Sequence, residues 1–263
     1  MMLPLMMDLS TSDNFTPRDS EVELFESAKS KNTIACLKAD LGKMFVAVML
    51  IREKAFEVCS SPLQLGGFSS VYITPTVKLA LQRSAYLRHH TPLKVGIFHE
   101  KKGVIKWSCQ RWKDELGKSQ VLVMTYQVFL EAIQKDFLEM SKLNLLILDD
   151  CHNVMNDEAL KKILALYEKS ANSLHPRILG LTASIVNNIC KPMELSQLIT
   201  ILENKLQSAI STSNNVLSAL QHSTRPKELV CEISSKPEAT RLELEIMDRV
   251  QQLSSYLRDH RYD

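Results

Sequence analysis

The chain has 263 residues, of which 45% are hydrophobic and 24% charged, and its formal net charge is +2 at pH 7. These values are typical of a soluble globular protein, and the length suits one large α/β domain or one domain and the start of another. The near-neutral charge excludes a bulk electrostatic attraction to nucleic acid or to a membrane, so any such contact must come from a local basic surface.

The N-terminal run Met1–Ser10 is apolar, but Pro4 and Asp8 interrupt it and it lacks a basic segment. We therefore interpret residues 1–14 as a disordered leader rather than a signal peptide. The longest apolar run, Met44–Ile51, is too short to cross a bilayer, which takes about 20 residues. Six cysteines without CxxC pairs or zinc-site spacing predict reduced thiols in a cytoplasmic protein.

Short β-rich runs then alternate with helical stretches, which predicts an α/β fold with a parallel sheet and crossover helices. The predicted strands are Thr33–Leu37, Val71–Thr74, Lys94–Phe98, Gln120–Met124, Leu145–Leu148 and Ile178–Leu181. The predicted helices are Glu21–Lys29, Lys43–Glu57, Val77–His89, Tyr126–Gln134, Glu158–Lys169 and Met193–Ile210. A short extended run, Glu228–Ile233, and a final helix from about Pro237 follow. The chain stops at Asp263 without a helix-terminating signal, which we interpret as a fragment of a longer protein.

A Gly-Lys pair, Gly42-Lys43, lies between the first predicted strand and the next helix. In a phosphate loop, backbone N–H groups and the lysine bind phosphates, and a Ser or Thr hydroxyl helps to hold magnesium. Here Asp40 places a carboxylate where an anion would bind, and Met44 offers no hard oxygen to the metal. An ordinary strand–turn–helix is the alternative interpretation of the pair.

Two acids, Asp149 and Asp150, follow the apolar run Leu145–Leu148, and ligands bind at such strand ends in parallel sheets. One carboxylate, Asp149, can hold magnesium weakly through water, while Asp150 orients an attacking water. The alternative is that the pair caps the following helix. Further along the chain, Thr182-Ala-Ser184 ends a second strand.

Hydroxyl side chains end two more strands, in Thr74-Pro75-Thr76 and at Thr125, where they suit contact with a nucleic-acid backbone. Basic and aromatic residues also alternate between Arg83 and Lys118. The candidate RNA-binding cations in that segment are Lys101, Lys102, Lys106 and Arg111. The alternatives are ordinary turn and cap residues, and a solvated helix that buries Trp107 and Trp112.

Taken together, these segments resemble the N-terminal DExD/H-type helicase lobe of the Dicer family, and most of all the insect paralogue that processes microRNA precursors. The segments that carry the resemblance are Phe15–Arg18, Val22–Leu24, Asn32–Ile34, Leu93–Gly96, Val121–Thr125, Leu148–His152, Pro176–Ser184 and Asp259–Asp263. The resemblance implies a RecA-like (P-loop NTPase) lobe over residues 15–210. Over residues 211–263 it implies a connecting strand and the first helix of a helical insertion.

The resemblance also implies ATP and Mg²⁺ as ancestral cofactors, Asp149 and Asp150 as catalytic acids, and Thr182 and Ser184 as residues that couple nucleotide to RNA. Three elements of the lobe depart from the family. Glu21 stands where active relatives have an adenine-reading glutamine, the loop Ala39–Met44 has lost its second glycine and its threonine, and Asp150 replaces a glutamate. The second lobe, with its arginine finger, and the ribonuclease III residues lie outside this chain.

We therefore expect a helicase lobe with a degenerate nucleotide site that serves RNA recognition and architecture within a Dicer-type ribonuclease III of microRNA processing. Its expected partner is double-stranded RNA or pre-microRNA. Two other functions remain open: a working ATP-dependent RNA helicase or translocase lobe, and a docking module for a double-stranded-RNA-binding protein.

Overall fold

The structure, a computed structural model, describes residues 17–37, 42–60, 67–170, 175–185, 192–212 and 245–252. The predicted leader, Asp40 and the predicted run Glu228–Ile233 lie outside these ranges. The chain divides into two units, Met1–Ser223 and Thr224–Asp263. In the second unit, residues 245–252 are helical, within the helix expected from about Pro237.

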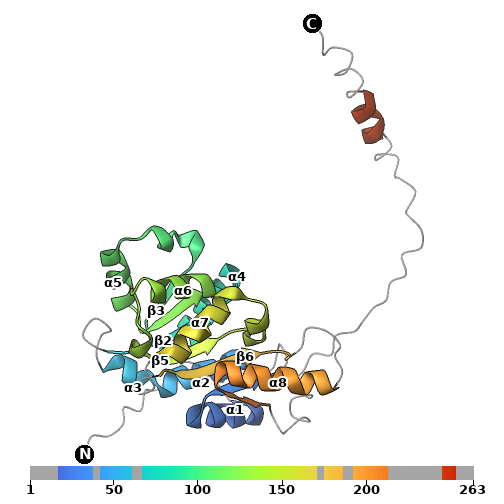
Figure 1. Cartoon of the computed structure of the whole chain (residues 1–263). Coiled ribbons are helices and arrows are strands. Elements are labelled where there is room, and N and C mark those ends of the chain that lie inside the picture. The colour runs from blue at the N-terminus through green and yellow to red at the C-terminus, as the bar shows by residue number, and fades with distance from the viewer. Residues whose placement is uncertain are drawn as a thin grey trace, which may run out of the picture. The chain divides into compact units, whose positions relative to one another are not determined.

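A seven-stranded sheet, in the order β3-β4-β2-β5-β6-β1-β7, forms the centre of the first unit, and its strand pairs are parallel (Figure 1). The strands are β1 (Thr33–Cys36), β2 (Ser69–Thr74), β3 (Val95–Phe98), β4 (Val121–Thr125), β5 (Leu143–Leu148), β6 (Arg177–Thr182) and β7 (Ala209–Ser211). All six predicted strands are present, with ends within two residues of the prediction.

Helices connect the strands, as parallel pairing requires. They are α1 (Asp19–Ser30), α2 (Lys43–Glu53), α3 (Ala55–Cys59), α4 (Val77–His90), α5 (Cys109–Gly117), α6 (Tyr126–Gln134), α7 (Glu158–Lys169) and α8 (Pro192–Leu206). Short 3-10 helices are η2 (Glu100–Lys102), η3 (Val104–Lys106), η4 (Met140–Lys142) and η5 (Cys151–Met155).

Two predicted helix boundaries were wrong. The helix predicted to run through Glu57 divides at Lys54, whose φ of −89° and ψ of 7° leave the helical region. The helix predicted to reach Ile210 ends at Leu206, because Gln207 adopts a positive φ of 47°. The chain then turns into β7, which pairs with β1 and forms one edge of the sheet.

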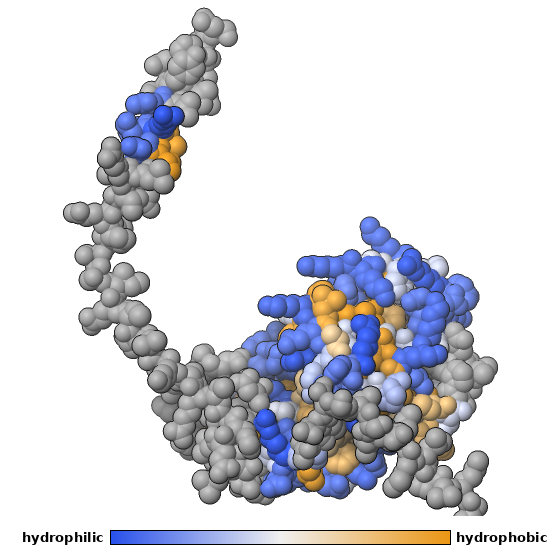
Figure 2. All heavy atoms as spheres, turned by 180° about the vertical axis from the view of Figure 1, so that it is seen from behind, coloured by the Kyte–Doolittle hydropathy of each residue, from blue (hydrophilic) through white to orange (hydrophobic). Residues whose placement is uncertain are grey.

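Both faces of the sheet are buried, since alternate strand residues enter different core clusters. Val71 and Ile73 pack with residues of α6 and α7, whereas Tyr72 packs with residues of α1, α2 and α4. This explains the nearly continuous apolar runs of the strands. Among the described residues, no helix is long and apolar enough to span a membrane. Figure 2 shows hydrophilic side chains over most of one face, around a smaller apolar area.

Candidate nucleotide site

The carboxyl ends of the strands place the predicted nucleotide-site residues around one hollow. It has a volume of about 240 Å³ and is lined by Gly42, Lys43, Met44, Phe45, Tyr72, Arg83, Tyr86 and Asp149. Because β2 and β5 are neighbours, the helix after β2 and the acids after β5 face the same space. The Gly-Lys turn and Asp149 therefore line the same hollow.

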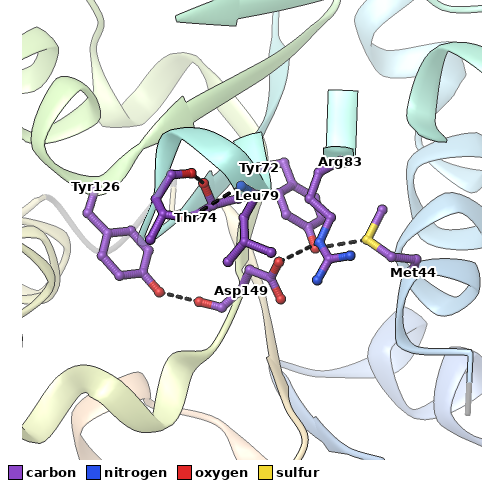
Figure 3. A network of polar contacts seen from close by, with 8 residues as sticks. Met44, Tyr72, Thr74, Leu79, Arg83, Tyr126 and Asp149 are labelled. Atoms are coloured by element: carbon purple, nitrogen blue, oxygen red, sulfur yellow. Dashed lines mark hydrogen bonds and ion pairs between the residues drawn. The ribbon is translucent and has the colours of Figure 1, made fainter. Parts of the chain in front are cut away.

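Asp149 is held from three directions. Its backbone N–H donates to the Ile73 carbonyl at 2.9 Å, and its own carbonyl accepts the hydroxyl of Tyr126. Its carboxylate, which is almost fully buried, accepts from Arg83 Nε at 2.7 Å (Figure 3). The carboxylate is thus oriented and already charge-paired within the protein.

Lys43 begins α2 beside these acids. Burial lowers the pKa of Lys43, while the charges of Asp149 and Asp150 act in the opposite direction. Burial, and then repulsion by Asp149, raises the pKa of Asp150, which follows in a left-handed conformation with a φ of 50°. Lys43 and Arg83 therefore lie beside the two carboxylates, and His152 also faces Asp150.

Met44 contacts a tyrosine where the family implies a metal-binding hydroxyl. Its Sδ lies 3.0 Å from the Tyr72 hydroxyl, which donates to it. Tyr72 is fully buried, and burial, followed by the charge of Asp149, raises its pKa well above the ordinary value. The dashed line between the Tyr72 hydroxyl and the Met44 thioether in Figure 3 marks this contact.

The donor set does not fit Mg²⁺. This ion prefers hard oxygen ligands in octahedral geometry, but Met44 presents sulfur and the Asp149 carboxylate is bonded to Arg83. Nowhere in the described ranges do three His, Cys, Asp or Glu side chains gather as a metal site would require. Asp40, whose carboxylate was expected where an anion would bind, lies outside those ranges.

Glu21 lies directly under the Gly-Lys turn. Gly42 has a φ of 85°, and a Cβ added to it would lie 1.8 Å from Glu21 Oε1. Glu21 is buried, and its Oε2 accepts from the Arg18 backbone N–H at 2.9 Å, which closes the first turn of α1. The role in nucleotide binding expected for this position stays a prediction.

His152, Thr182 and Ser184 connect the two predicted motifs. His152 Nδ1 lies 2.9 Å from the Thr182 hydroxyl, and that hydroxyl donates to the Ser184 carbonyl at 2.6 Å. Because Thr182 uses its proton toward Ser184, His152 Nδ1 is the donor in the first contact. The end of β6 is therefore bonded to the segment that follows the acids.

The strand-end hydroxyls expected to contact RNA have partners inside the protein. Thr74 is buried and donates to the Thr76 carbonyl, and Thr76 accepts from the Leu79 N–H as the cap of α4. Thr125 is buried and donates to Glu100 Oε1 at 2.8 Å. Pro75 is half-buried between the two threonines. Their contact with RNA stays a prediction.

The predicted cations surround a buried aromatic cluster. Lys102 Nζ and the Arg111 guanidinium lie 5.4 and 4.4 Å from the centre of the Trp107 ring, and Trp107 and Trp112 are buried. Lys102 Nζ also donates to the Ile97 carbonyl. Lys101 in the middle of η2 and Lys106 at the end of η3 are exposed. Two of the four cations thus contribute to packing as well as to surface charge.

Sequence reasoning missed Arg83, Tyr72 and Tyr126 as residues of this site. No motif marks them, because Tyr72 has the sequence pattern of an ordinary strand residue and Arg83 lies in the second turn of a helix. The available signal was the direction of helical side chains, which point back toward the N-terminus of the helix and here toward the strand ends.

Comparisons with known proteins agree with this arrangement. A family model described as DEAD/DEAH box helicase matches residues 21–191. Endoribonuclease Dicer of Gallus gallus is 34% identical over 87% of this chain, and that of Danio rerio is 31% identical over 98%. The chain spans only 12% and 13% of the lengths of these relatives.

A solved structure confirms the predicted RecA-like fold class. The crystal structure of the Pyrococcus furiosus Hef helicase domain has a TM-score of 0.62 to this chain at 19% identity. The match covers 80% of this chain and 41% of that chain. The likeness is one of fold alone.

Proposed function

Because the chain belongs to the DEAD/DEAH box helicases, and among them to the N-terminal helicase region of the Dicer homologues, we propose that it is a lobe that recognises RNA without ATP turnover. It would serve as an RNA-binding and architectural part of a larger ribonuclease that processes microRNA precursors, as the insect paralogue does. The expected location is the cytoplasm.

The contact between Met44 and Tyr72 is the observation that supports the loss of ATP turnover most directly. Phosphoryl transfer depends on metal ions that bridge the phosphate oxygens and neutralise developing charge. A thioether 3.0 Å from a buried tyrosine hydroxyl supplies no ligand for such an ion. The chain keeps the contacts from His152 through Thr182 to Ser184, which join the acids to the next strand.

Binding measurements on the chain itself test this proposal. A fluorescent ATP analogue with Mg²⁺ should show no saturable binding tighter than about 1 mM, equivalent to about −4 kcal/mol. A pre-microRNA hairpin should bind with the same affinity with and without ATP. Tight binding of the analogue that is lost in Lys43→Ala, but not in the exposed control Lys118→Ala, would favour a working helicase lobe instead.

A docking module is a second candidate, and the buried threonines favour it. The hydroxyls of Thr74 and Thr125 donate hydrogen bonds to groups inside the protein. This reduces the polar surface that is available to an RNA backbone. In that case the chain would capture a double-stranded-RNA-binding protein while failing to bind the hairpin itself. Binding of the hairpin by the isolated chain would exclude this candidate as the main function.

A further inference from the structure

Arg83 provides the nucleotide pocket with a permanent cation. We propose that its guanidinium replaces a divalent metal as the counter-ion of Asp149, so that the pocket is locked in a metal-independent form. This inference rests on the proposed function, because a lobe that turned over ATP would need the Asp149 carboxylate for its metal. It goes further by naming the residue that takes the metal's place.

The geometry of the ion pair supports the replacement of a metal ion by the Arg83 guanidinium, because the pair is not a loose surface contact. Arg83 Nε lies 2.7 Å from Asp149 Oδ2, and the exposed fractions of the two side chains are 18% and 2%. Breaking a buried pair by removing one partner is costly, because it leaves an uncompensated charge. Asp149 also cannot turn away easily, since Ile73 and Tyr126 hold its backbone.

The charges around the pocket are balanced without a metal. Lys43 and Arg83 supply two positive charges, and Asp149 and Asp150 supply two negative charges when ionised. A dication would add charge beside two existing cations, and the acids have no excess negative charge to attract it. A polyphosphate would in turn meet two carboxylates. The pocket is therefore suited neither to Mg²⁺ nor to a nucleotide triphosphate.

The same contacts join separate elements around the site. Arg83 comes from α4 and Asp149 from the end of β5, while Tyr72 of β2 contacts Met44 of α2. A bound metal and nucleotide would otherwise bridge this space. The ion pair thus supports the phosphate-binding end of the lobe in the absence of ligand.

Arg83→Gln tests the proposal in the full chain, with Mg²⁺ or the paramagnetic probe Mn²⁺ as the only added ligand. The wild type should bind no Mn²⁺ at this site, and its Tm should not respond to millimolar MgCl₂. Arg83→Gln should lower the Tm by about 5 °C or more and gain a stabilisation by MgCl₂. Arg88→Gln is the matched control on the same helix, because Arg88 donates to the Val95 carbonyl rather than to an acid of the pocket. It should gain no response to metal.

Two further variants cover a failure of Arg83→Gln to fold. Asp149→Asn combined with Arg83→Gln replaces the ion pair with two neutral amides and should fold where the single variant does not. Arg83→Lys keeps the charge and should still exclude Mn²⁺. The proposal would be overturned if the wild type bound Mn²⁺ and Asp149→Asn removed that binding. It would also be overturned if the double variant were no more stable than Arg83→Gln alone. Nucleotide binding by the wild type would instead refute the proposed function, because these metal readouts contain no nucleotide.

Discussion

Gly42 and Gly103 both have a positive φ, but their surroundings differ. A Cβ at Gly42 would overlap the buried Glu21 carboxylate, whereas nothing lies within 4 Å of a Cβ built on Gly103. Gly103→Ala should therefore cost only the left-handed strain of about 1 to 2 kcal/mol. Gly42→Ala should cost at least about 1 kcal/mol more, since Glu21 must also move. Urea unfolding of the two variants measures the difference, and equal costs would show that Glu21 is not held in place.

The acidity of Asp150 predicts a pH dependence of stability. Its pKa is raised above the ordinary value of 3.8 by burial and then by Asp149. The folded state therefore binds this proton more tightly than the unfolded chain, and the associated stability is lost as the pH rises above 3.8 through the raised pKa.

Asp150→Asn has no carboxyl to ionise, so it should not lose stability as the pH rises. Asparagine also tolerates the left-handed backbone at this position. The variant should have a higher Tm than the wild type at pH 7, and the difference should shrink as the pH approaches 3.8, where both states of the wild type take up the proton. Thermal unfolding between these pH values provides the measurement. A variant less stable than the wild type at pH 7 would mean that the attraction to Lys43 and His152 outweighs burial.

Among the elements, η2 and η3 carry two exposed cations of the basic segment, Lys101 and Lys106. Replacing Lys101 and Lys106 with glutamine should weaken pre-microRNA binding and reduce the log–log salt slope by about two, since each phosphate contact contributes about one. Lys162→Gln with Lys169→Gln on α7 is the matched control, because both lysines are exposed on another helix. If RNA affinity and salt slope changed equally in the two double variants, the effect of Lys101 and Lys106 would be one of non-specific charge alone.

Periodicity in the sequence predicted the elements of the sheet and the edge at which the site lies. Apolar runs located β1 to β6, and the family resemblance implied that Asp149 and Lys43 belong to one nucleotide site. The partner of Asp149 was not predictable in this way, because the reach of Arg83 depends on how α4 packs on the sheet. β7 was missed because its three residues, Ala209–Ser211, are too few to show an alternating pattern.

The basic segment between Arg83 and Lys118 is a second case in which the sequence did not decide between two structures. Alternating tryptophans and cations predicted either an RNA-binding strip or a solvated helix over a buried aromatic cluster. The structure buries Trp107 and Trp112 and places Lys102 and Arg111 near the Trp107 ring. Composition alone cannot separate these outcomes, since a cation on an aromatic ring can also remain at the surface.

At the scale of the whole molecule, the lobe combines a complete RecA-like sheet with a pocket that carries its own counter-ion. The contact between His152, after the acids, and Thr182 of β6 is present, so the proposed loss of ATP turnover would come from the phosphate and metal positions rather than from the fold. A larger protein containing this chain would then use the lobe as a fixed surface, and its RNA binding would not cycle with nucleotide.

RNA-stimulated phosphate release by the intact protein that contains this chain tests the central claim most directly. Wild type and Lys43→Ala should release phosphate at the same background rate with and without pre-microRNA, because the first lobe contributes no metal site. The measurement is made on a form that carries a second RecA lobe, so that a missing lobe could not explain the absence of turnover. Turnover in the range of about 1 to 100 per second that RNA stimulates and Lys43→Ala abolishes would contradict the account and identify a working helicase.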